Sequence, residues 1–474
     1  MMCRLKCSLI IFIILFFILS SFACAQENRP ADKNEQMTAI KEIIMEEILI
    51  RLSQENKAKP IESNKKLLSW LGLDEKYFGL HGYMETRNYY HFRRNNDYYY
   101  RYELRDNLRI SKEFNFSKEL HGMASLDGRV FYFDNSADGF KRKESRFEPW
   151  EIYLDYYGDK LNLRVGQQLM RWGKSDEVNP TDVFSPEDLS EFFNEVERAK
   201  RKLPVFAVKT DAYFKNYSLE TFWLPFFRKT RLDEAGNDWE PYLFRYYRSL
   251  GLRFLDDHGP SKRVEHSSFA AKIKREGENS DLSLSYSYHY AETPALEINP
   301  LLFQVSSIYP RQHTIGSDFE TVIGKFGLRA EGALTTKTPF LSYDPQVPST
   351  ILYKNALNYI IGADYTLPSD LYINLQYTQQ YIFNYSKDLA TQQSEDSIVW
   401  RISQNLRHET IVLKTTGRYF LSTKDLLFEA SLLYKFTDNF NLTAGLYLFD
   451  GQDNGTFGQY KKNDQLFARL KYSF

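Results

Sequence analysis

Charged side chains recur at alternate positions in the first part of the chain and are the strongest candidates for a functional site. In the stretch YYYRYELRDNLRI, three arginines share one side, because successive side chains of a strand point to opposite faces. The same alternation continues in later segments, and it assigns to one inner wall Arg101, Arg105, Arg109, Asp127, Arg129, Glu151, Asp155 and Arg164. Such a wall either selects solutes by charge or is stiffened by its own salt bridges, and the two interpretations are compatible.

Residue types that support catalysis or metal binding form no comparable constellation. Ser283, Ser285, Ser287 and His289 alternate on one face, which chance alone produces on a polar strand face. No two histidines stand two or four positions apart, and the acidic stretch FDGQDNG lacks the spacing of a calcium loop. We therefore expect no enzyme activity, no bound metal and no cofactor.

The first 25 residues have the order of a secretory signal peptide. Arg4 and Lys6 precede an apolar run, and Ala-Cys-Ala then ends at Ala25. We predict cleavage near Ala25; lipidation of Cys24 is the alternative, but the usual large aliphatic residue before it is missing. All three cysteines lie in this segment, so the mature chain is expected to contain neither disulfides nor metal-thiolate sites.

The composition is polar on average but rich in aromatic residues. Mean hydropathy is −0.50, while aromatic residues make up 16%, with 34 Tyr and 36 Phe. Beyond the signal segment, no apolar run approaches the ~20 residues of a membrane-spanning helix. A net charge of −1 gives no basic field for nucleic acid. An exported chain of this kind is typical of an outer-membrane barrel, in which apolar and polar faces alternate.

From about residue 77 to 474 the pattern has period two, in segments of about ten residues, which predicts a transmembrane antiparallel β-barrel. Tight connections alternate with long ones, as at Gly158-Asp159, Lys215-Asn216, Gly324-Lys325 and Pro368-Ser369-Asp370. We count eighteen strands, with sixteen as the alternative. The last strand ends on Phe474, which suits a strand that closes the barrel with its aromatic ring at the membrane interface.

Residues 26–76 differ from the rest. Met37, Ile40, Ile44, Ile48 and Leu52 fall on one helical stripe, with charged residues opposite. This predicts a short helical periplasmic segment, which either rests at the barrel rim or plugs the barrel.

The connection 172–203 is longer than an ordinary hairpin loop, and such long connections are commonly functional. Ser185 and Pro186 suggest a helix N-terminus, and an apolar stripe follows at helical spacing. We predict a helix here that folds into the barrel and forms its narrowest point; a helix covering the outer mouth is the alternative.

The same region resembles a family of bacterial outer-membrane barrel proteins of unassigned function. The family pattern combines G-R-Q-x-x-x-W-G, N-P-x-D and a later L-E-x-x-W-x-P, and Gln167 stands here in place of the arginine. The matching residues are Gly166, Gln168, Trp172, Gly173, Asn179, Pro180, Asp182, Leu219, Glu220, Trp223 and Pro225. The resemblance implies a large porin-like barrel, in a family sometimes associated with the movement of hydrophobic compounds.

From the sequence we therefore expect an outer-membrane channel for passive or facilitated passage of small solutes. Two alternatives stay open: a channel for hydrophobic compounds in which residues 26–76 act as a hatch, and a non-conducting scaffold barrel. The expected partners are outer-membrane lipid, the insertion machinery of a Gram-negative-type bacterium and a small-molecule solute, with a homo-oligomer or a periplasmic partner as further options and no nucleic acid.

Overall fold

The computed structural model describes residues 79–92, 102–135, 140–175, 178–190, 198–233, 237, 239–343 and 351–474. The predicted signal peptide, the helical segment 26–76 and Arg101 lie outside these residues. Contacts divide the chain into two units, one of Met1–Leu80 with Asp134–Lys141 and one of His81–Phe133 with Arg142–Phe474. The second unit contains the barrel.

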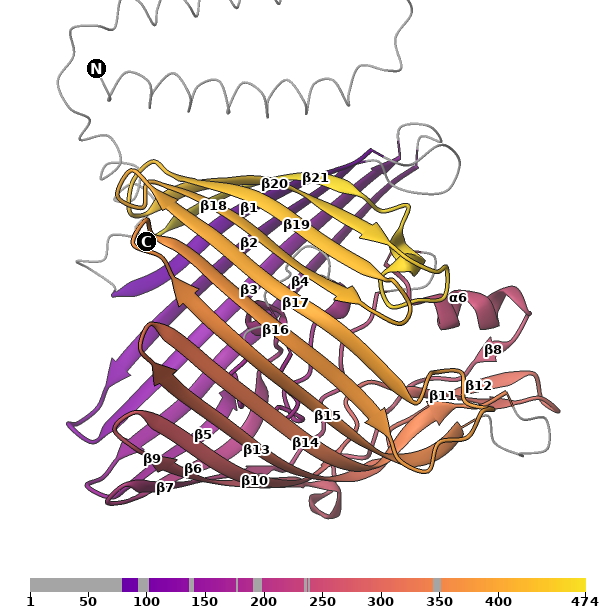
Figure 1. Cartoon of the computed structure of the whole chain (residues 1–474), viewed down its shortest axis with the longest axis horizontal. Coiled ribbons are helices and arrows are strands. Elements are labelled where there is room, and N and C mark those ends of the chain that lie inside the picture. The colour runs from indigo at the N-terminus through magenta and orange to yellow at the C-terminus, as the bar shows by residue number, and fades with distance from the viewer. Residues whose placement is uncertain are drawn as a thin grey trace, which may run out of the picture. The chain divides into compact units, whose positions relative to one another are not determined.

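Eighteen of the strands in the described residues form one sheet (Figure 1). These strands are β1 (Leu80–His91), β2 (Tyr102–Asn115), β3 (Leu120–Asn135), β4 (Phe140–Tyr157), β5 (Leu161–Gln168), β6 (Val205–Phe214), β7 (Tyr217–Leu224), β9 (Ser268–Glu276), β10 (Ser280–Tyr290), β13 (Arg311–Ile323), β14 (Phe326–Leu341), β15 (Ile351–Thr366), β16 (Leu371–Ile382), β17 (Ser394–Leu406), β18 (Ile411–Phe420), β19 (Leu426–Lys435), β20 (Phe440–Asp450) and β21 (Gln465–Ser473).

The sheet closes on itself as an antiparallel barrel. Neighbours along the chain pair with each other, β7 pairs with β9, β10 pairs with β13, and β21 pairs with β1. Phe474 continues this last pairing, because it exchanges two backbone hydrogen bonds of 2.8 and 3.0 Å with Gly82. The predicted barrel of eighteen strands is thus confirmed, and sixteen is wrong.

The remaining elements lie in the long connections. Strands β8 (Arg253–Phe254), β11 (Ala295–Asn299) and β12 (Gln304–Ile308) form a small second sheet, next to helix α6 (Tyr242–Ser249) (Figure 1). The short helices are α5 (Arg198–Arg201), η3 (Val264–His266) and η4 (Gly458–Tyr460). No helix in the described part of the chain is long and apolar enough to cross a membrane.

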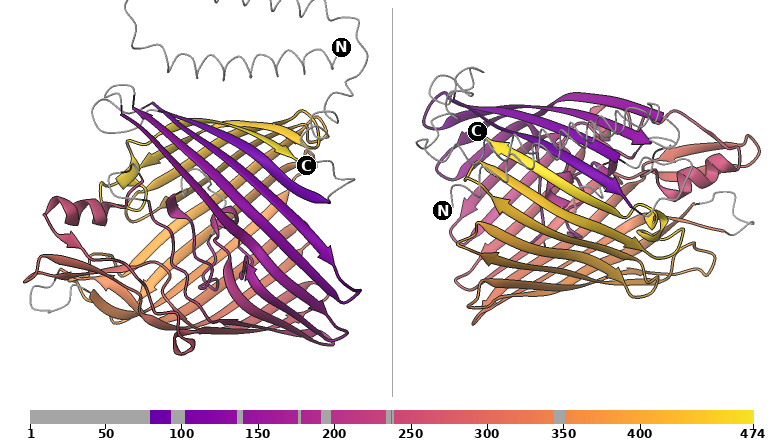
Figure 2. Two further views of the ribbon diagram at one scale, coloured as in Figure 1. Left: turned by 180° about the vertical axis from the view of Figure 1, so that it is seen from behind. Right: turned by 90° about the horizontal axis from the view of Figure 1, so that it is seen from above.

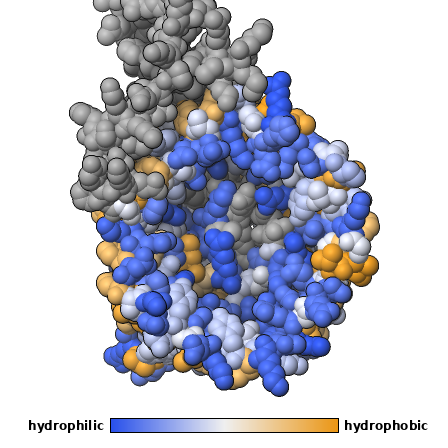
Figure 3. Space-filling model, turned by 90° about the vertical axis from the view of Figure 1, so that its left-hand side faces the viewer, coloured by the Kyte–Doolittle hydropathy of each residue, from blue (hydrophilic) through white to orange (hydrophobic). Residues whose placement is uncertain are grey.

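Alternation of side chains gives the barrel an apolar exterior and a polar interior. On β10, Leu282 and Leu284 are 49% and 57% exposed, whereas Ser283 and His289 between and beyond them are 2% and 4% exposed. The phase of the alternation changes once on β4, where Trp150 and Glu151 both turn away from the exposed face that carries Phe147 and Ile152. Hydrophilic side chains cover the end of the barrel that carries the short turns, with hydrophobic ones at its flanks (Figure 3).

The connection between β5 and β6 enters the barrel (Figure 2). We call its described parts, residues 169–175, 178–190 and 198–204, the inward segment. Its side chains and backbone bond to the inner faces of strands on both sides of the ring, from Arg105 on β2 to Glu331 on β14. In the ring of eighteen, β2 and β14 lie opposite each other, so the segment crosses the interior.

The helix predicted from Ser185 onward begins in the wrong place. The Ser185 hydroxyl lies 2.7 Å from the Met170 carbonyl oxygen and 2.8 Å from an Asp182 oxygen, which share its one hydrogen, and it caps no helix. Glu187 and Asp188 instead form β-bridges with Lys202 and Arg231. Backbone groups near Glu187 and Asp188 thus bond to Arg201 and Arg231 instead of to a helix that starts at Ser185, and the α-helix among the described residues of this connection is α5.

Candidate functional site

The inward segment starts from a buried aromatic cluster at the end of β5. Trp172 lies 4.7 Å from Phe184 and 5.5 Å from Phe222 between ring centroids, and its indole N–H donates to Glu220 at 2.8 Å. Just before it, Gln168 is buried and donates to the Ala207 carbonyl at 3.0 Å. These contacts hold the root of the segment against β6 and β7.

Gly173 allows the chain to turn from the wall into the interior. Its φ is +91°, in the region that favours glycine, and a Cβ there would lie 2.5 Å from a Glu331 oxygen. Glu331 is 3% exposed. It accepts hydrogen bonds from the Lys174 N–H at 3.0 Å and from the Thr181 N–H and hydroxyl at 2.9 and 2.8 Å. One buried carboxylate on β14 therefore fixes two points of the segment.

Lys174 attaches the segment to two further strands of the same side. Its ammonium donates to Asp281 on β10 at 3.2 Å and to Glu320 on β13 at 2.9 Å. Burial by itself would lower the pKa of Lys174, but the hydrogen bonds to Glu320 and Asp281 outweigh it and raise the pKa above its ordinary value. Lys174 therefore stays charged at neutral pH.

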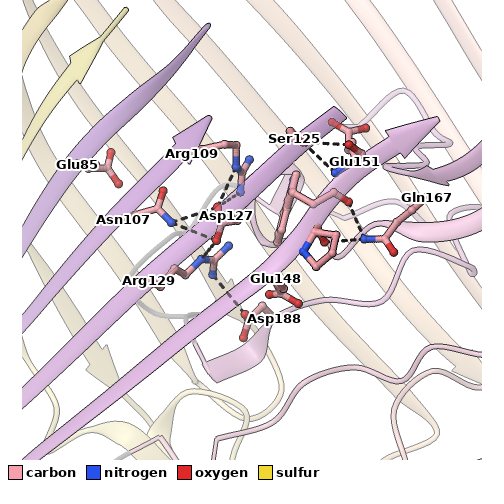
Figure 4. Close-up of polar contacts among 12 residues, drawn as sticks. Glu85, Asn107, Arg109, Ser125, Asp127, Arg129, Glu148, Glu151, Gln167 and Asp188 are labelled. Carbon is pink, nitrogen blue, oxygen red and sulfur yellow. Dashed lines mark hydrogen bonds and ion pairs between the residues drawn. The ribbon is translucent and has the colours of Figure 1, made fainter. Parts of the chain in front are cut away.

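Most of the family-pattern residues belong to this attachment. Asn179 donates to the Ser175 carbonyl at 2.6 Å, and Asp182 accepts from Ser185 and forms an ion pair with Lys202. Gln167, in place of the family arginine, donates to the carbonyls of Pro149 and Trp150 (Figure 4). A second group lies elsewhere: Leu219 and Trp223 are exposed on the outside of β7, and Pro225 is buried just after that strand.

On the opposite side of the ring, arginines of β2 and β3 surround Asp127. Arg109 donates to Asp127 at 2.7 and 2.9 Å, Asn107 donates at 3.2 Å, and Arg129 forms an ion pair with it (Figure 4). Arg129 also reaches Asp188 of the inward segment at 3.4 Å. The structure therefore brings three of the predicted residues, Arg109, Asp127 and Arg129, together at one place on the wall.

Of the other predicted residues, Arg105 lines the same cavity as Arg109 and Arg129, whereas Arg164, Asp155 and Glu151 do not line it. Arg164 pairs with Asp155 at 2.6 and 2.8 Å and lies over the Tyr153 ring. Glu151 accepts the Leu169 N–H at 3.0 Å, at the root of the segment. Arg105 pairs with Glu103 at 2.7 Å and donates to the Ser190 carbonyl at 3.3 Å.

A cavity of about 510 Å³ lies between the inward segment and the strands around Asp127, and we call it the chamber. Its walls come from β1 to β4, from β17 to β21 and from the segment. Twelve basic residues line it: Arg87, Arg105, Arg109, Arg129, Arg171, Lys200, Arg201, Lys202, Arg401, Lys414, Arg469 and Lys471.

The described lining of the chamber carries more basic than acidic side chains. Its acidic lining residues are Glu85, Asp106, Asp188 and Glu429, so basic residues outnumber acidic ones by twelve to four on the lining. Some of the lining cations pair with carboxylates behind the lining, such as Arg105 with Glu103 and Arg109 with Asp127. A confined space in which lining cations outnumber lining carboxylates raises the local concentration of anions.

Sequence reasoning found three of the twelve basic residues that line the chamber, Arg105, Arg109 and Arg129, and two acceptors at the root of the segment, Glu151 and Glu220. Arg469 and Lys471 follow the inward alternation of the last strand, so the same reading of period two would have found them. Glu331 and Lys174 carry no local sequence signal for their role, because the residues they bond to lie far away in the sequence.

The closed ring, its apolar outer face and its polar interior define an outer-membrane β-barrel of the porin-like type. Residues 66–394 match the model of a family described as "Protein of unknown function (DUF1302)", and the chain belongs to this family. The predicted resemblance to an outer-membrane family without assigned function is thereby confirmed. No curated protein matches the sequence.

The chain is also similar to solved outer-membrane proteins. For Acinetobacter baumannii OccAB3, identity is 11% over 83% of this chain and 99% of that chain, with a TM-score of 0.47. For Pseudomonas aeruginosa OpdK with vanillate, identity is 12% over 83% and 98%, with a TM-score of 0.46. For Salmonella typhi OmpF in complex with daunomycin, identity is 11% over 83% and 97%, with a TM-score of 0.41. Similarity at this level carries no information on what this chain transports.

Proposed function

We propose that the protein is a passive outer-membrane channel for small hydrophilic solutes and that it prefers anions. The predominance of basic over acidic side chains on the lining of the chamber, twelve to four, carries this proposal. Rings and walls of charged side chains are a general means of ion selection in pores. The inward segment narrows the interior at the level of the chamber, so a passing solute comes close to these charges.

The polar lining distinguishes this proposal from the transport of hydrophobic compounds. Aromatic side chains do line the chamber, but two of its arginines lie over one of them: Arg109 and Arg129 are 4.1 and 5.1 Å from the Trp150 ring. Cation–π contacts of this kind present charge rather than apolar surface to the cavity. A channel for hydrophobic compounds with a hatch formed by residues 26–76 is the alternative suggested by the sequence. Cleavage near Ala25 and insertion by the outer-membrane machinery stay predictions.

The test is the reversal potential of the refolded protein in planar bilayers under a KCl gradient. We expect a reversal potential of the sign that corresponds to chloride passing more readily than potassium. A preference for potassium would overturn anion selectivity. Negligible conductance of a protein that still migrates differently on SDS gels before and after boiling would favour a scaffold barrel.

A further inference from the structure

A second cavity, of about 570 Å³, lies among the long connections and is lined by residues 227–232 and 257–262 together with side chains such as Tyr309. We call it the outer cavity. Arg231 lines it, and Asp188 lines the chamber. The two side chains are bonded to each other, with an Arg231 nitrogen donating to an Asp188 oxygen at 2.7 Å. An ion pair therefore joins the walls of the two cavities.

The Asp188 carboxylate sits in a cradle of three arginines from three different elements. Besides Arg231, Arg129 on β3 lies at 3.4 Å and Arg146 on β4 at 3.9 Å from the same Asp188 oxygen. The other oxygen accepts the Ser190 hydroxyl at 2.5 Å, and the residue is 2% exposed. Three guanidinium groups around one carboxylate form a binding site for an oxyanion, and a residue of the chain occupies it.

The side chain of Arg231 has a second anchor besides the Asp188 carboxylate. Its second terminal nitrogen donates to both oxygens of Glu148 at 3.0 Å, while its backbone N–H donates to the Glu187 carbonyl at 2.9 Å. Burial would lower the pKa of Arg231, but Asp188 and Glu148 outweigh it and raise the pKa. If the Asp188 side chain turned aside while its backbone stayed bridged to Arg231, the Arg231 guanidinium would stay charged and in place, with one nitrogen open toward both cavities.

We propose that this cradle is an exchange site for the carboxylate of a passing organic anion. A solute entering from the outer cavity replaces Asp188 as the partner of Arg231, then reaches Arg129 and enters the chamber, after which Asp188 returns. Asp188 is thus a tethered competitor that keeps the site from holding a solute too tightly. This inference rests on the proposed anion channel and assigns the step between its two cavities.

The test uses acetate as the probe and measures single-channel conductance at increasing sodium acetate concentration. Asp188→Asn removes the competing charge, so we expect the half-saturating acetate concentration to fall several-fold. Glu187→Gln is the matched control, because it removes a neighbouring carboxylate that pairs with Arg201 at 3.2 Å and does not belong to the cradle. In this control we expect little change.

A second pair of variants tests the acceptor side of the exchange. Arg231→Gln should raise the half-saturating acetate concentration several-fold. Arg263→Gln removes an exposed arginine in the same group of connections, paired only weakly with Glu265 at 3.4 Å, and should leave it unchanged. A difference in migration on SDS gels between boiled and unboiled samples checks that each variant forms a folded barrel. If Asp188→Asn does not fold, the comparison of Arg231→Gln with Arg263→Gln tests the exchange site by itself.

The exchange site would be overturned if the half-saturating acetate concentration were the same in Asp188→Asn as in Glu187→Gln. It would also be overturned if this concentration were the same in Arg231→Gln as in Arg263→Gln. Either result could occur in a channel that still prefers chloride over potassium, so the proposed function would survive it. Loss of the proposed function shows instead as a wild-type protein without anion preference.

Discussion

Two sides of the barrel interior use charged residues in different ways. We call the inner faces of β7, β10, β13 and β14 the anchoring wall, where Glu220, Asp281, Glu320 and Glu331 hold the inward segment. Across the ring, the strands around the chamber carry mainly arginine and lysine. Lysines and arginines neutralise the anchoring carboxylates, as Lys209 does for Glu220 and Arg329 does for Glu320. On the chamber side, the cations outnumber the carboxylates.

This difference separates two properties of a pore, its width and its charge selectivity. Paired charge on the anchoring wall sets where the segment lies, and therefore how wide the passage is. Unbalanced charge at the chamber sets which sign of solute concentrates there. Changes on the anchoring wall should then act on conductance, and changes at the chamber should act on selectivity.

The largest effect is expected from removal of the middle of the inward segment. Deletion of residues 186–200 should raise single-channel conductance several-fold, because the described residues of this stretch lie between the anchoring wall and the chamber. The measurement is conductance in planar bilayers, with heat-dependent migration on SDS gels as the control for folding. Unchanged conductance of a folded barrel would mean that the segment does not limit the passage.

Loss of the buried anchor should have the next largest effect. Glu331→Ala leaves the Lys174 N–H and the Thr181 N–H and hydroxyl without their acceptor, which we expect to cost roughly 2–5 kcal/mol in the free energy of unfolding. Conductance should become larger and noisier while the reversal potential keeps its sign. Glu320→Gln is the matched control, because Glu320 lies on the same wall but is about a third exposed. It should change the free energy of unfolding and the conductance much less.

Neutralisation of cations that line the chamber should act on ion selectivity. Arg109→Gln together with Arg129→Gln should shift the reversal potential toward cations more than it changes conductance, because each variant replaces a lining cation by a neutral amide that can still donate a hydrogen bond to Asp127. Arg164→Gln serves as the control: Arg164 pairs with Asp155 and does not line the chamber. An equal shift from Arg164→Gln would show that net charge, rather than the chamber, determines selectivity.

The smallest effect is expected at the root of the segment. Trp172→Phe keeps a ring beside Phe184 and Phe222 but removes the hydrogen bond to Glu220, which should cost about 1 kcal/mol of stability. Urea unfolding of the protein in vesicles measures it. Trp223→Phe, on the outward face of the neighbouring strand, provides the comparison, and a larger loss there would contradict the assigned role of Trp172.

The parts of this molecule that local pattern determines could be predicted from the sequence. Period-two alternation predicts eighteen strands and their inward faces, because the apolar and polar residues of each strand show which of its faces points toward the interior. The helix start at Ser185 was wrong because Asp188 and its neighbours bond to Arg201 and Arg231, which a local capping signal cannot reveal. For the same reason, Glu331 could not be recognised as the anchor, since the residues it binds lie on another part of the chain.

The distance in sequence between that anchor and its partners has a consequence for how the barrel assembles. Glu331 follows Thr181 by 150 residues, whereas Trp172 bonds to Glu220 only 48 residues away. The root of the segment can therefore be fixed as soon as β5, β6 and β7 are paired, but the bonds from Thr181 to Glu331 form only when β14 is in the ring as well. We therefore expect the segment to reach its final position in the interior, and the passage its final width, only after strands far apart in the sequence have come together.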